Sequence, residues 1–167
     1  MEALEKYKMG FTYTVELLDG DVLVAKETVD NVLPYEGLDY IERTSLLGGP
    51  QISQWYLGLF GNNYNPTPQD KALSFAQQAG EVSAYENDTR HQVTFNQPDM
   101  GMITNTGNEV EVVFTAEVSV TGGFLISSPG KGSSIGVLLS AVRFNSPKQA
   151  EPGNVLRVTT GLQLTPA

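Results

Sequence analysis

The chain contains no cysteine and only one histidine, His91, in its 167 residues. Without cysteine there is no disulfide framework, no redox pair and no thiolate metal site. A single histidine also excludes the metal triad of two histidines and one carboxylate. We therefore predict that the protein binds no metal and no cofactor, and that it is made and assembled inside a cell.

Positive charge is scarce as well. Ten lysine and arginine residues against nineteen aspartate and glutamate residues give a formal net charge of −9. An acidic surface repels nucleic-acid phosphates and anionic lipid headgroups, so we predict no nucleic-acid partner and no membrane partner. No apolar run approaches the roughly 18 residues of a membrane-spanning helix. Residues 1–8 carry mixed charge and no apolar stretch, so we expect no secretory signal there.

Catalytic motifs are absent from the sequence. A Ser-His-Asp triad would have to use His91, and no Gly-x-Ser-x-Gly elbow supplies a nucleophile. Glu109 and Glu111 share one face of a predicted strand, but positions i and i+2 of any strand can match the carboxyl spacing of a glycosidase. We interpret this pair as part of a solvated polar face. We therefore expect no catalytic residues and predict that the protein is not an enzyme.

Residues that form turns are, by contrast, frequent, with 17 glycines and 9 prolines. Together with many threonine, valine and serine residues, they favour short β-strands joined by turns over a helical bundle. A chain of 167 residues fits one domain. We expect an N-terminal arm over residues 1–10 and a single β-sandwich domain over residues 11–167.

Alternating apolar and polar residues predict the strands. The segment from Phe11 to Leu18 alternates, and the Asp19-Gly20 pair after it predicts a type I′ hairpin into a second strand from Val22. The segment from Ile52 to Phe60 ends in an apolar run, which indicates a strand at the centre of a sheet. Further strands are expected near residues 82–86, 91–96, 109–116, 118–127, 135–144 and 154–164.

One segment departs from the β pattern. Over residues 35–47, apolar residues recur at roughly helical spacing between Pro34 and the Gly48-Gly49-Pro50 stop, which predicts one short helix. Residues 69–78 offer few apolar anchors, so we expect a loop with at most one helical turn. Eight or nine short strands with regular turns predict an all-β fold, namely a jelly-roll-like antiparallel β-sandwich.

Aromatic residues provide the candidate contact sites. Trp55 shares a strand face with Leu57 and Leu59, which predicts a core position. Tyr64 lies in an Asn-Asn-Tyr-Asn-Pro loop, and aromatic side chains on loops anchor many interfaces. The predicted interface residues are Tyr7 in the arm, Tyr64, Pro66 and Phe75.

The segment from Trp55 to Asp70 resembles a stretch in small virion structural proteins of tailed bacteriophages. Those proteins carry an aromatic-x-Gly-Leu-Phe strand, an Asn-Tyr-x-Pro loop and then an alanine-rich segment. This sequence departs from the pattern at Lys71 to Gln78, which is more polar. The resemblance covers roughly residues 10 to 165, with further similar segments at 81–86, 89–90, 123–128, 136–144 and 153–159.

The resemblance implies a phage particle component with no catalytic residues. The role we expect is a capsid decoration (cement) protein that binds and stabilises the shell of major capsid protein. It would be assembled in the host bacterial cytoplasm and lie on the virion surface. Open strand edges favour pairing with itself, as a dimer or trimer. The alternatives are another virion component (tail, fibre or neck) and a carbohydrate-binding β-sandwich module or enzyme outside the virion.

Overall fold

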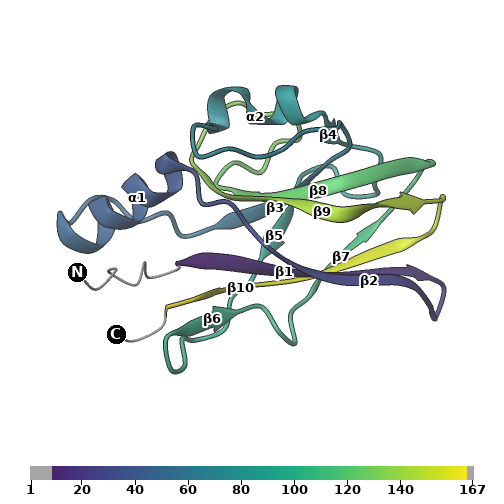
Figure 1. The fold of residues 1–167 in the computed structure, drawn as a ribbon, viewed down its shortest axis with the longest axis horizontal. Coiled ribbons are helices and arrows are strands. Elements are labelled where there is room, and N and C mark those ends of the chain that lie inside the picture. Colours follow the sequence, from purple (N-terminus) through teal and green to yellow (C-terminus); the bar gives the residue numbers. More distant parts are fainter. Residues whose placement is uncertain (1–8, 165–167) are drawn as a thin grey trace, which may run out of the picture.

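The structure, a computed structural model, describes residues 9–164 and contains two five-stranded antiparallel sheets and two short helices (Figure 1). The predicted mainly-β fold is confirmed. Residues 1–8 of the arm expected over 1–10, with Tyr7, lie outside the described residues, and Gly10 already belongs to the first strand. Neither helix among the described residues has the length and apolar character needed to cross a bilayer.

Each sheet is built around strands distant in sequence. In the first sheet the order is β2-β1-β10, and β6 and β7 both pair with β10. In the second the order is β4-β3-β8-β9, and β5 also pairs with β3. The first sheet comprises β1 (Gly10–Asp19), β2 (Val22–Asp30), β6 (Met102–Thr104), β7 (Val110–Val113) and β10 (Val155–Gln163). The second comprises β3 (Trp55–Phe60), β4 (Glu81–Val82), β5 (His91–Val93), β8 (Val118–Ile126) and β9 (Leu138–Ala150).

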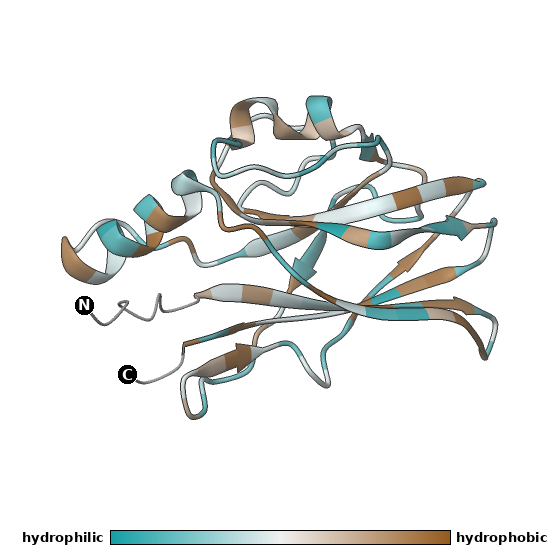
Figure 2. Cartoon of the chain, viewed as in Figure 1, coloured by the Kyte–Doolittle hydropathy of each residue, from teal (hydrophilic) through white to brown (hydrophobic). Residues whose placement is uncertain are grey.

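The main core lies between the two sheets. As predicted, the alternate residues of β1 from Phe11 to Leu17 point inward and are buried, as are Leu156, Val158 and Thr160 of β10. They meet Leu57 and other apolar residues of the second sheet. Trp55, for which a core position was predicted, is only partly buried and packs at the margin of this cluster. Hydrophobic segments are visible on facing strands of both sheets in Figure 2.

The two sheets are joined along one side. Val32, just after β2, forms a two-way backbone bridge with Ala141 of β9, with N–O distances of 2.8 and 3.1 Å. Lys148 of β9 pairs with Glu27 of β2. Burial raises the pKa of Glu27, but hydrogen bonds from Lys148 and the nearby backbone outweigh it and hold the pKa below its ordinary value. This side of β2 is therefore covered, and its edge is less open than the sequence indicated.

The helix α1 (Tyr35–Leu46) confirms the predicted helix at residues 35–47. It crosses β9 so closely at Gly37 that a Cβ there would lie 2.5 Å from the Leu139 carbonyl oxygen. The neighbouring Glu36 carboxylate accepts hydrogen bonds from the backbone N–H groups of Leu138 (2.7 Å) and Ala72 (2.8 Å). A small residue and a carboxylate together attach α1 to the second sheet.

The prediction of one helix was wrong, because α2 (Ala72–Ala79) occupies the segment expected to be a loop. Its buried face consists of Ala72, Phe75, Ala76 and Ala79, at helical spacing. Of the two large apolar residues in this segment, Phe75 is buried, whereas Leu73 points outward and is 74% exposed. Alanine supplies most of the buried face of this helix.

Several predicted boundaries also shift. The β1–β2 turn is Gly20-Asp21, and only Gly20 has a positive φ (58°), the pattern of a type II′ turn rather than type I′. The short strand β6 was not predicted, and β3 begins at Trp55. The strand expected at 135–144 continues to Ala150. Residues 144–147 are unpaired, and pairing with β8 resumes after them. Pro147, which lacks an N–H, lies in this interruption.

Leu156 tests the packing between the sheets, since its side chain is 0% exposed. We expect Leu156→Ala to lower the free energy of unfolding by about 2–5 kcal/mol, because it leaves a cavity in the core. Urea denaturation measures the change. Thr159→Ala, on the other face of the same strand, is the matched control and should alter stability by less than about 0.5 kcal/mol. An equally small effect of Leu156→Ala would contradict the observed packing.

Candidate functional site

Phe75 is not an interface residue, contrary to the prediction. Its side chain is 0% exposed and lies between α2 and the second sheet. Its ring contacts Phe60, Tyr64 and Phe124 edge-on, with centroid separations of 5.1–5.7 Å. These contacts make Phe75 the centre of a second, smaller core.

The ring and the hydroxyl group of Tyr64 also make contacts within the molecule. Its ring packs against Phe75, and its hydroxyl donates to Asp70 Oδ1 at 2.5 Å. Burial and the adjacent carboxylate raise the pKa of the Tyr64 hydroxyl to about 12. Arg143 donates to the Tyr64 carbonyl at 3.0 Å, and Pro66 in the same loop is half-buried. Tyr64 thus anchors its own loop to α2 and β9 instead of presenting a free ring.

The residues considered for chemistry lie on different sheets. His91 begins β5 in the second sheet, as expected, whereas Glu111 lies on β7 of the first. Glu111 pairs with Arg157 at 2.9 Å, and Glu109 accepts a hydrogen bond from the Gly107 N–H. Over residues 9–164, no three histidine, aspartate or glutamate side chains gather in a metal-binding group.

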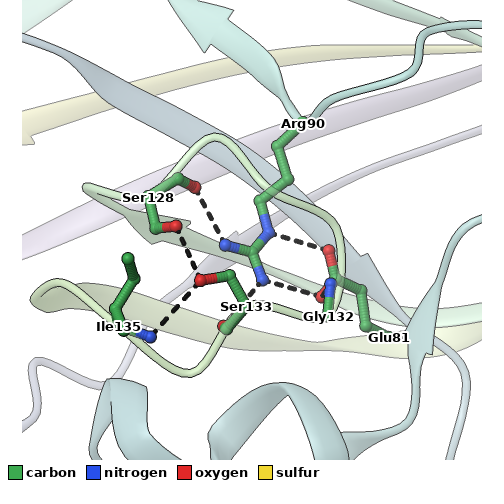
Figure 3. A network of polar contacts seen from close by, with 6 residues as sticks. All are labelled: Glu81, Arg90, Ser128, Gly132, Ser133 and Ile135. Atoms are coloured by element: carbon green, nitrogen blue, oxygen red, sulfur yellow. Dashed lines mark hydrogen bonds and ion pairs between the residues drawn. The ribbon is translucent and has the colours of Figure 1, made fainter.

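A buried ion pair, Arg90 with Glu81, was missed by the sequence analysis (Figure 3). Arg90 Nε and Nη2 each donate to one carboxylate oxygen of Glu81 at 2.8 Å. The guanidinium also donates to the carbonyl oxygens of Ser128 (2.9 Å) and Ser133 (3.2 Å), and Glu81 accepts from the Gly132 N–H at 2.7 Å. We call this group the Arg90 clasp. It ties residues 128–133 to strand β4. Its only signal in the sequence was a pair of opposite charges, Glu81 and Arg90, on either side of residues 86–88.

A hollow of about 520 Å³ lies beside α2, next to the clasp. We call it the α2 hollow. Small residues from α2 and the clasped loop line it, including Ala72, Ala76 and Gly132, and the lining also includes Leu73 and Glu81. Ile135, one residue beyond the lining residue Ser134, is 71% exposed. A rigid hollow with small residues and exposed aliphatic side chains beside it suits the insertion of a partner's side chain.

A larger groove of about 860 Å³ lies beside α1, and we call it the α1 groove. Its walls are α1 and residues 50–52, 68–71 and Val137. It adjoins the α2 hollow, since Lys71 lines the groove and the next residue, Ala72, lines the hollow. We call the surface that carries both the helix face. In Figure 1 α2 lies above the second sheet, on the side away from β6, and α1 lies at the left end of that sheet.

No protein-family model matches this chain, and no curated protein matches its sequence. The assignment of the site therefore depends on the geometry of the chain's own residues.

The Arg90 clasp predicts a large response to a single change. Glu81→Gln would leave the buried Arg90 guanidinium without its counter-charge, and we expect a loss of about 3–5 kcal/mol of unfolding free energy. Glu111→Gln is the matched control, because the Glu111–Arg157 pair is exposed and should contribute at most about 1 kcal/mol. Chemical denaturation of both variants measures the difference. A loss in Glu81→Gln as small as the one expected for Glu111→Gln would show that the clasp is not a stabilising element.

His91 predicts a pH dependence. Its ring lies against Tyr85, its Nδ1 is buried without a hydrogen-bond partner among the described residues, and burial, with Lys131 as a second cause, lowers its pKa from 6.5. The unfolded chain therefore takes up a proton that the folded chain resists, so stability should decrease as the pH falls below about 6.5.

Urea denaturation between pH 7.5 and pH 5 tests this dependence. One titrating group can change the free energy of unfolding by at most about 1.4 kcal/mol per pH unit. The partial exposure of the His91 ring makes the expected change smaller. His91→Gln should flatten the curve over this range. The steeper decrease below pH 4.5, to which Glu27 contributes, should remain in both proteins. A wild-type slope that survives in His91→Gln would assign the effect to other groups.

Proposed function

We propose that this chain is a bacteriophage capsid decoration (cement) protein that binds the major capsid protein through the α2 hollow. The observation that carries the proposal is the pair of exposed aliphatic side chains, Leu73 and Ile135, 74% and 71% exposed beside a preformed hollow. The two facing sheets are compatible with the jelly-roll-like β-sandwich that we propose as the finer description of the fold. The resemblance to small virion proteins supports the same class.

The energetics suit a shell protein that binds in many copies. Burying a large aliphatic side chain contributes about 1.5–3 kcal/mol, so Leu73 and Ile135 supply a modest affinity at each site. The Arg90 clasp fixes the loop before Ile135, which limits the entropy lost on binding. The net charge of −9 requires neutral or basic patches on the capsid, because contact between like charges is unfavourable.

Self-association would use a different part of the molecule. At the tip of the β1–β2 hairpin, Val22, Leu23 and Val24 are all exposed on an edge strand. Val24 is the extra residue of a bulge, because Leu17 and Leu18 pair with Ala25 and Leu23. A bulge disfavours plain edge-to-edge pairing, so we propose that a dimer or trimer forms through these apolar side chains.

Capsid binding tests the proposal. We expect the double variant Leu73→Asp, Ile135→Asp to lose at least 90% of its binding to purified capsids that lack the protein, because it places charge at the apolar contact. Met100→Asp, at a still more exposed apolar position (92%) just before β6, should bind like the wild type. Co-sedimentation measures binding. Capsids carrying the protein should break at a higher temperature than bare capsids.

Two further measurements separate the alternatives. Quantitative mass spectrometry of virions should give hundreds of copies for a shell protein, whereas a dozen or fewer would indicate a tail, fibre or neck component. Light scattering should give the mass of two or three chains, and a strict monomer would contradict self-association. Wild-type protein that does not bind capsids, or a double variant that binds normally, would overturn the docking proposal.

A further inference from the structure

The α1 groove is held open by hydrogen bonds between its walls. The Tyr35 N–H at the start of α1 donates to the Pro68 carbonyl at 2.8 Å, and the Ile52 N–H donates to the Tyr40 hydroxyl at 2.8 Å. Glu36, which also belongs to α1, accepts hydrogen bonds from the backbone N–H groups of Ala72 and Leu138. The three walls are therefore tied together without any ligand, which is the usual state of a small-molecule site.

Five of the polar side chains that line this groove have no hydrogen-bond or ion-pair partner within the described residues. No hydrogen bond or ion pair joins the side chains of Asp39, Arg43, Gln51, Gln69 or Lys71 to another described residue, although several other lining groups are engaged. They come from α1 and from the two loops opposite it. The groove thus offers donors and acceptors from more than one wall.

An exposed aromatic ring stands at the same groove. Tyr35 is 58% exposed, lines the groove, and its hydroxyl has no partner within the described residues. Pro50, Pro68 and Val137 add apolar surface to the lining. The accessible aromatic ring and the apolar surface suit a ligand with flat C–H surfaces. The free polar side chains suit hydroxyl groups around the edge of the same ligand.

The charge of the groove favours a neutral ligand. Its lining contains three carboxylates, from Glu36, Asp39 and Asp70, and two cationic side chains, from Arg43 and Lys71. This near balance attracts neither anions nor cations strongly, and the net charge of −9 further disfavours anions. Sugar hydroxyls both donate and accept, so they can use carboxylate, amide and guanidinium groups together.

We propose that the α1 groove is a binding site for a neutral oligosaccharide, with Tyr35 stacking on a sugar ring and Asp39 and Arg43 binding its hydroxyls. This site does not depend on the capsid-docking proposal, because it uses different residues. In this proposal Tyr35 takes the place of Tyr64 as the aromatic contact residue, because the ring and hydroxyl of Tyr64 are already engaged within the molecule.

Calorimetric titration of the full chain with maltohexaose, cellohexaose and chitohexaose tests the proposal, with hyaluronan hexasaccharide as the acidic control. We expect at least one neutral hexasaccharide to bind and Tyr35→Ala to weaken that binding at least tenfold. Asp39→Ala and Arg43→Ala should each weaken it several-fold. Because these three side chains make no hydrogen bond or ion pair within the described residues, their variants should fold, and circular dichroism verifies this.

The matched control is the double variant Leu73→Asp, Ile135→Asp, which should bind the oligosaccharide normally. Conversely, Tyr35→Ala should bind capsids normally, so the failure of either proposal is distinguishable from failure of the other. Three outcomes would overturn the oligosaccharide site: no binding of any neutral hexasaccharide, binding of hyaluronan alone, or unchanged binding by folded Tyr35→Ala.

Discussion

Two glycine–phenylalanine pairs on neighbouring strands of the second sheet form the surface on which helix α2 packs. The Phe124 ring lies over Gly58 on the neighbouring strand, where an added Cβ would be 2.1 Å from the ring. The Phe60 ring lies over Gly122 in the same way. Each glycine leaves room for a large ring on the facing strand, and the two rings, with Phe75, form the second core. The helix α2 packs on this core, and the Arg90 guanidinium lies 5.3 Å from the centre of the Phe124 ring.

Because β3 and β8 are buried on both faces, the polar groups around them must be satisfied internally. Glu36 does this by binding backbone N–H groups at the starts of α2 and β9, and Glu81 and Arg90 do it by binding backbone groups of the 128–133 loop. Each interaction fixes a segment that borders one of the two candidate sites. Rigidity of the helix face is therefore a consequence of satisfying buried polar groups. A preformed surface loses little conformational entropy on binding, which is an advantage for a protein whose proposed role is attachment.

The sequence predicted those elements whose pattern is local. The alternation in β1 and β10 and the Pro34 and Gly48 limits of α1 identified both strands and one helix correctly. The second helix was missed because alanine carries its buried face, and alanine gives a weak periodic signal. Strand β6 has only three residues, too few for alternation to be recognised. The strand expected at 135–144 was too short, because β9 resumes its pairing beyond the unpaired residues 144–147, which include Pro147.

The candidate sites were harder to predict because they are assembled from distant segments. Tyr64 and Phe75 were assigned to an interface on loop composition alone, and nothing local shows that each lies against the other. The α1 groove joins residues near 35–44, 50–52 and 68–71, and its free polar groups are recognisable only once their neighbours are known. The groove and the α2 hollow adjoin at Lys71 and Ala72, where Glu36 binds the Ala72 N–H, and separate hydrogen bonds hold their other walls. Coupling between two sites requires an element with two arrangements that both ligands bias differently. The hydrogen-bonded walls offer no such element, so a saccharide in the groove should leave capsid affinity unchanged.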